Sequence, residues 1–178
     1  MTQRWIRLSA RPLVGAVLLA ASGLVAAAAG NRTAHADEAS DTVQANVSVA
    51  SAISLTVHTD AFTLSGPPNT TVTELNAISF SVTTNNAGGY TVGGRSTEAA
   101  LQPQDPANPD VIPISRLEFR PSGETLWVPM TTTHQVTRNV DGPSAPGGDD
   151  FSTDFRVHIP NVRSDSYRTT LVYTAATK

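Results

Sequence analysis

Apolar and polar residues alternate along much of this chain. Val43, Val47 and Val49 stand at odd positions with polar neighbours, and Ile53 and Leu55 continue the same odd-numbered series. Alternation with a period of two predicts β-strands that have one buried face and one solvent face. Further short runs of alternating, β-branched or aromatic residues follow at 61–64, 78–82, 90–92, 111–119, 125–130, 134–140, 151–159 and 167–175.

Turn-forming residues separate these runs. The segment Asn85–Gly89 supplies Asn and Gly for the positive φ angles of a tight connection, and 141–150 is a long loop rich in Gly and Pro. No stretch shows the 3.6-residue period of an amphipathic helix. The pattern therefore predicts an all-β fold, an antiparallel Ig-like β-sandwich of about eight or nine strands. A closed barrel is the alternative.

The first 36 residues do not belong to this pattern. Three arginines precede an apolar run over 13–29, and the small-x-small sequence Ala34–Ala36 follows. This order is typical of a cleaved secretory signal peptide at 1–36, with a retained membrane anchor as the alternative. The remaining residues, 37–178, have the length of one β-sandwich domain.

Composition narrows the functions that are open to residues 37–178. They hold 8 basic and 15 acidic residues, a net charge of −7, which disfavours nucleic acid as a partner. The chain has no cysteine, so disulfides, thiol catalysis and a lipidated cysteine are excluded. No sortase-type signal or apolar tail follows the last strand, and no membrane span is expected after processing. We therefore expect a secreted, extracellular protein that is released or held to the cell wall by non-covalent contacts.

One group of acidic residues suggests a metal. Asp141, Asp149, Asp150 and Asp154 cluster around the glycine-rich loop, and calcium prefers hard oxygen ligands of this kind. The spacing matches no EF-hand, and a solvated acidic loop is the simpler interpretation. Calcium is the one cofactor for which the sequence offers candidate ligands.

Two aromatic residues are candidates for ligand binding. Trp127 and Tyr90, if exposed and coplanar, would form a platform on which a sugar ring stacks. The alternative is that both belong to the core.

No catalytic motif is present in the sequence. The closest approach to a Gly-x-Ser-x-Gly elbow, at residues 94–98, lacks the pattern, and no histidines have metalloprotease spacing. Glu118 and Glu124 flank a turn and are better explained as surface charges of a hairpin than as a glycosidase pair. We expect no catalytic residues and no enzymatic activity.

Three segments together resemble a known family. The turn and strand Thr84–Val92, the Phe-x-Val-x-Ile-Pro strand Phe155–Pro160 and the closing strand Ser166–Ala175 follow the order seen in secreted β-sandwich domains of Gram-positive bacteria related to the WxL cell-surface domain. The family's Trp-x-Leu motifs are absent, because Trp127 is followed by Val and Pro. The resemblance therefore implies the fold more directly than the wall attachment associated with those motifs.

These observations predict a secreted, non-enzymatic structural or adhesive protein of the cell surface or medium. Its expected partners are a cell-wall polymer or a surface protein, reached by loops or an exposed sheet edge. A carbohydrate-binding module is the first alternative and a secreted hydrolase the second. The sequence leaves the oligomeric state open.

Overall fold

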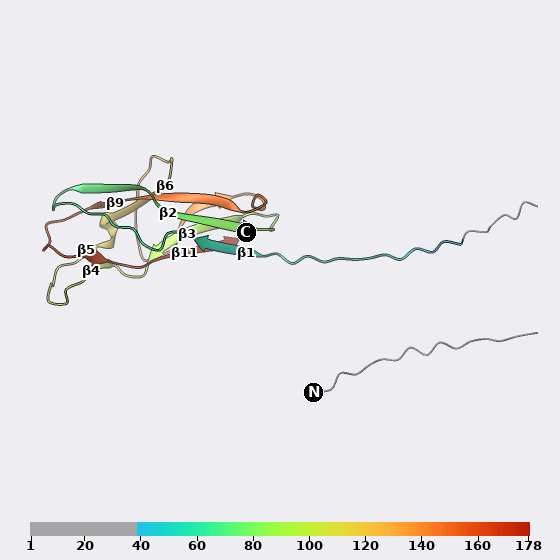
Figure 1. Ribbon diagram of the computed structural model, residues 1–178, viewed down its shortest axis with the longest axis horizontal. Helices are drawn as coiled ribbons and strands as arrows, with labels where there is room; N and C mark the ends of the chain where they lie inside the picture. Colours follow the sequence, from blue (N-terminus) through green and yellow to red (C-terminus); the bar gives the residue numbers. More distant parts are fainter. Residues whose placement is uncertain (1–38) are drawn as a thin grey trace, which may run out of the picture. The chain divides into compact units, whose positions relative to one another are not determined.

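Strands account for almost all regular structure in the computed structural model, which describes residues 39–178 (Figure 1). The predicted signal peptide, 1–36, lies outside the described residues. The elements are β1 (Ile53–Val57), β2 (Thr71–Thr84), β3 (Tyr90–Ser96), β4 (Ala100–Pro103), β5 (Ile112–Pro113), the 3₁₀ turn η1 (Ile114–Arg116), β6 (Leu117–Pro121), β7 (Val128–Pro129), β8 (Gln135–Val140), β9 (Asp149–His158), β10 (Tyr167–Arg168) and β11 (Leu171–Thr177).

The strands form two main sheets and one small one. The first main sheet has the order β1-β2-β9-β6-β7 and the second β11-β3-β8, while β10-β4-β5 makes a short third sheet. All pairings are antiparallel. The prediction of an all-β antiparallel sandwich is confirmed, and free edges at β1, β7, β8 and β11 distinguish it from a closed barrel. Three of the eleven described strands have only two residues, so the eight longer ones agree with the predicted number.

The strand order is partly that of an immunoglobulin domain. In the first sheet, β9 lies between β2 and β6, which reproduces the A-B-E-D order of immunoglobulin-type sheets. In the second sheet the central strand is β3, whereas the immunoglobulin sheet has a late strand at its centre. Residues 46–178 make one compact unit, and residues 39–45, which are in no strand or helix, fall in a separate one.

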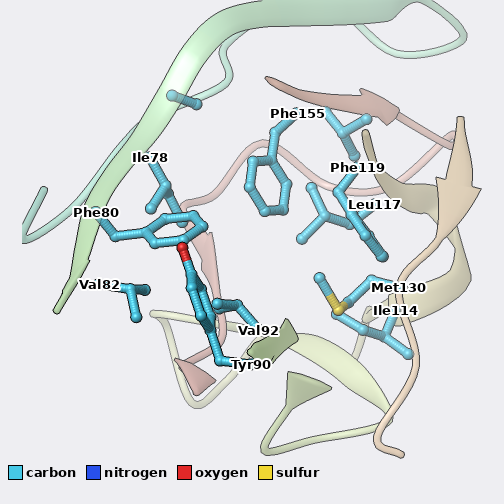
Figure 2. Packing of buried hydrophobic residues seen from close by; sticks show 12 residues of the cluster. Ile78, Phe80, Val82, Tyr90, Val92, Ile114, Leu117, Phe119, Met130 and Phe155 are labelled. Carbon is cyan, nitrogen blue, oxygen red and sulfur yellow. The ribbon is translucent and has the colours of Figure 1, made fainter. Parts of the chain in front are cut away.

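The core lies between the two main sheets. Phe80 and Val82 of β2 face Tyr90 and Val92 of β3, and all four side chains are fully buried (Figure 2). The Phe80 ring lies 5.3 Å from that of Tyr173 on β11, a contact that joins the sheets directly. The other buried apolar members of this cluster are Ala77, Ile78, Ile114, Leu117, Phe119, Met130, Phe155 and Val157.

Two predicted strands do not form. Residues 39–52 and 58–70 lie outside every strand, so the predictions at 43–49 and 61–64 are wrong. Phe62, in the second segment, still packs against the core, with its ring 4.7 Å from that of Phe155. Its apolar side chain is partly buried by tertiary packing, without a neighbouring strand to pair its backbone. No helix of membrane-spanning length and hydropathy occurs in residues 39–178.

Candidate functional site

The outer face of the five-stranded sheet carries two cross-strand ion pairs, each of which joins β6 to β9. Along β6 and β9, core residues alternate with residues whose side chains point to the outer face of the sheet. The antiparallel register places Glu118 opposite Arg156 and Arg120 opposite Asp154. Arg120 Nε lies 2.9 Å from Asp154 Oδ2, and Arg156 pairs with Glu118. Opposite charges face one another in both pairs, which stabilises this register.

Trp127 packs on the arginines of these pairs. The guanidinium carbon of Arg120 lies 4.5 Å from the Trp127 ring centroid, and that of Arg156 lies 4.6 Å from it. Both distances are within the range of a cation–π interaction. The ring is half-buried. Its π-surface is therefore engaged within the protein, which weakens the prediction that Trp127 stacks on a sugar.

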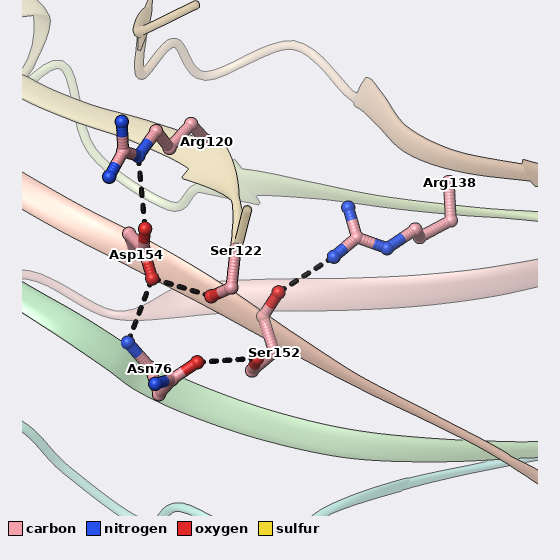
Figure 3. A network of polar contacts seen from close by, with 6 residues as sticks. All are labelled: Asn76, Arg120, Ser122, Arg138, Ser152 and Asp154. Carbon is pink, nitrogen blue, oxygen red and sulfur yellow. Dashed lines mark hydrogen bonds and ion pairs between the residues drawn. The ribbon is translucent and has the colours of Figure 1, made fainter. Parts of the chain in front are cut away.

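Asp154 is the most deeply buried charged residue on this face. Its side chain is 3% exposed, and its two oxygens accept hydrogen bonds from three groups (Figure 3). Oδ2 accepts from Arg120 Nε, and Oδ1 accepts from the backbone N–H of Asn76 at 2.8 Å and from the Ser122 hydroxyl. Asn76 donates from a break in the β2–β9 register, where its φ is 53°. An irregular point in β2 thus turns a backbone N–H toward a buried carboxylate.

These contacts set the acidity of Asp154. Burial raises the pKa of its carboxyl, but hydrogen bonds from Asn76, Ser122 and Arg120, with the Arg120 charge, outweigh burial and hold the pKa below its usual value. The carboxylate is therefore ionised at neutral pH, and its ionised form stabilises the fold.

A pH dependence of stability follows from this depressed pKa. The contribution of Asp154 is fully present above its unfolded pKa, near 4, and is lost as the pH falls through the lower folded value. We expect the free energy of unfolding to fall as the pH drops from about 5 to 2, and to fall less steeply in Asp154→Asn. Urea denaturation of both proteins across this range measures the slopes, and equal slopes would contradict the assignment.

The four aspartates of the predicted calcium site have separate partners. Asp141 pairs with Lys178, Asp149 accepts from the Tyr90 hydroxyl, Asp150 accepts from a serine of β2, and Asp154 belongs to the network above. Within residues 39–178 no three His, Cys, Asp or Glu side chains are grouped closely enough to hold a metal ion. The structure thus adds no support to the calcium prediction.

Tyr90 does not present a ring face to solvent. It is fully buried between the two main sheets, and its hydroxyl donates a hydrogen bond to Asp149 Oδ2 at 2.5 Å. Burial, followed by this hydrogen bond, raises the pKa of Tyr90. Tyr90 and Trp127 therefore do not make one exposed platform, and Tyr90 follows the alternative interpretation as a core residue.

Two hollows lie beside β8, the larger against β9 and the end of β6 and the smaller against β6 and β7. The larger, of about 520 Å³, is polar, with Arg138, Glu124 and Asp150 in its lining. Arg138 is held there by a 2.7 Å hydrogen bond to the Ser152 carbonyl (Figure 3). The smaller, of about 260 Å³, is an apolar groove, whose lining includes Phe119, Leu126, Val128 and Val136.

The apolar groove marks an open side of the sandwich. β7 is the last strand of the first sheet and β8 the last strand of the second, so within residues 39–178 no further strand pairs with either of them on this side. Leu126 is 73% exposed and Val136 is 58% exposed on this side. We call this feature, lined by Phe119, Leu126, Val128 and Val136, the β7/β8 groove.

Asp154 and Trp127 are among the predicted site residues, but neither the cross-strand ion pairs nor the groove was predicted as a site. A signal for the pairs exists in the sequence, since Glu118-x-Arg120 and Asp154-x-Arg156 repeat an acidic-x-Arg pattern on two strands. Antiparallel pairing of two such strands places each acid opposite an arginine. The groove has no comparable signal, because it depends on which strands end their sheets.

No protein-family model matches this chain, and no curated protein sequence matches it. The resemblance to WxL-related domains remains a prediction.

Proposed function

We propose that this protein is an exported, non-enzymatic structural or adhesive protein that binds a surface protein or wall polymer through the free β7/β8 edge. The observation that carries the proposal is the exposure of Leu126 and Val136 beside the β7/β8 groove. Exposed apolar side chains that gather around a groove are typical of interaction sites. A free strand such as β8 also offers backbone hydrogen bonds to an added strand.

The polar side chains on the sheet face support the same proposal. Arg120, Arg156 and Trp127 are engaged with one another and with carboxylates, so they act as a scaffold for the first sheet. A partner that binds the apolar β7/β8 edge would leave the ion pairs and the cation–π contacts of these residues intact.

A cell-fractionation experiment tests the proposal. In a host that exports the chain, we expect the protein in salt-released wall extracts or in complex with a surface protein. The double variant Leu126→Asp/Val136→Asp should reduce this recovery by about tenfold or more, because two charges would have to be desolvated on binding.

A matched control uses exposed apolar residues at other positions. Leu75 and Val111 are 61% and 42% exposed and do not line the β7/β8 groove. The variant Leu75→Asp/Val111→Asp should be recovered like the unaltered protein. Equal recovery of all three proteins would refute a role for this edge.

A further inference from the structure

The segment before β1 has the pattern of a strand but is not one. Val43, Val47 and Val49 continue the odd-numbered series of β1, and they are 94%, 88% and 78% exposed. Only Ile53–Val57 of this series is paired with another strand, β2. Three exposed valines on one side of an extended pattern leave an apolar face uncovered. We call residues 42–52 the N-terminal segment.

The end of this segment is fixed at the β1 edge of the sandwich. The Asn85 side chain accepts a hydrogen bond from the backbone N–H of Ala52 and donates one to the carbonyl of Ala50, both at 2.8 Å. The Thr84 hydroxyl donates to the Ala52 carbonyl at 2.7 Å. The chain is thus held at residues 50–52, immediately after Val49.

The β7/β8 groove is suited to receive the apolar valine face of the N-terminal segment. It exposes apolar side chains between two sheet edges, and Glu124 is the charged residue in its lining. The N-terminal segment, Thr42–Ala52, contains no charged residue, so neither side would have to bury an unpaired charge apart from Glu124 at the rim. Elsewhere, the acidic composition of residues 37–178 opposes contact between copies.

The lengths also agree. A strand rises about 3.3 Å per residue, so the eleven residues of the segment span about 36 Å. β8, with six residues, spans about 20 Å. The segment is therefore long enough to pair along all of β8 while residues 50–52 keep their contacts with the donor copy.

The topology favours a second copy as the donor. β1 and β11 contact each other at one side of the sandwich, whereas β7 and β8 lie at the other ends of the two sheets. Four strand spacings of about 4.8 Å, roughly 19 Å, separate β1 from β7. A molecule's own segment would use about six residues to cross this distance, which leaves too few of residues 42–49 to pair along β8, whereas the segment of a neighbouring copy need not cross the sheet.

We propose that the N-terminal segment of one copy inserts as an added strand into the β7/β8 groove of the next copy. The valines cover the exposed side chains of Leu126 and Val136, and the backbone pairs with β8. The two surfaces differ, so the contact is heterologous and repeats from copy to copy, giving an open chain or a ring. This inference deepens the proposed function and rests on it, because it names a second copy of this chain as the partner of the free edge.

Two variants test the insertion separately on each side. Val47→Asp/Val49→Asp inactivates the donor segment, and Leu126→Asp/Val136→Asp inactivates the groove. We expect the unaltered purified protein to form oligomers whose size grows with concentration in sedimentation velocity. Each variant alone should be monomeric, with an unchanged circular dichroism spectrum.

Mixing the two variants gives the decisive result. One supplies an intact groove and the other an intact segment, so an equimolar mixture should form a heterodimer and nothing larger. Leu75→Asp/Val111→Asp serves as the control and should form oligomers like the unaltered protein. A mixture that stays monomeric, or an unaltered protein that is monomeric up to millimolar concentration, would overturn the inference.

The outcomes separate this inference from the proposed function. If the unaltered protein is monomeric while Leu126→Asp/Val136→Asp still reduces wall or partner recovery, self-insertion is wrong and the proposed function stands. If neither oligomers nor recovery depend on these residues, both are wrong.

Discussion

Phe80→Ala is expected to lower the free energy of unfolding by about 3–5 kcal/mol, the range for removing a buried aromatic side chain. Phe80 is fully buried, and its ring lies 5.3 Å from Tyr173 on β11 and 5.6 Å from Phe151 on β9. The substitution removes a contact between the sheets as well as apolar surface. The β2 and β9 backbones are joined in a ladder, so they cannot close the resulting cavity without breaking hydrogen bonds.

Equilibrium denaturation in urea measures this effect as a lower midpoint with an unchanged slope. Leu75→Ala provides a matched control on the same strand, since Leu75 is exposed and its truncation should cost less than about 1 kcal/mol. A similar loss in both variants would show that the space between the sheets is not filled as the structure describes.

Asp154→Ala should cost about 3–5 kcal/mol, because one partner of a buried ion pair is removed and the other remains. The Arg120 guanidinium, the Asn76 N–H and the Ser122 hydroxyl would each lose an acceptor. The Arg120 side chain is 22% exposed, so water would offset part of its loss, and the lower end of the range is expected.

Asp150→Ala is the control for this prediction. Asp150 also lies on β9 and accepts a hydrogen bond from Ser81, but it is exposed, so its removal should cost about 1 kcal/mol or less. A double-mutant cycle with Arg120→Ala isolates the pair, and we expect a coupling energy above about 1 kcal/mol. Additive losses would contradict a direct interaction between Arg120 and Asp154.

Local pattern predicted the strands of the first main sheet that pack on the core. Alternation at Ile78, Phe80 and Val82 and at Phe155 and Val157 corresponds to the buried faces of β2 and β9. Apolar side chains at every second position lie together on one face of a strand, where they can be buried as a group. These elements could therefore be inferred from the local sequence alone.

The same rule failed where the partner strand is missing. Val43, Val47 and Val49 alternate as regularly as the residues of β1, but residues 39–52 are in no strand. A strand requires backbone hydrogen bonds from another strand, and alternation contains no information about whether one is available. The candidate site was missed for the same reason, since pairing of Glu118 with Arg156 depends on the register of β6 and β9.

The sequence by itself determined the all-β class, the faces of the main strands and the acidic, cysteine-free composition, because each of these depends on residue types and their spacing. Tertiary structure alone decided that Tyr90 is a core residue, that Asp154 is a buried partner of Arg120, and that the four aspartates have separate partners. It also decided that β7 and β8 end their sheets and that an apolar groove is lined by residues of both. These outcomes depend on which strands become neighbours, and that choice is made by packing between residues far apart in the chain.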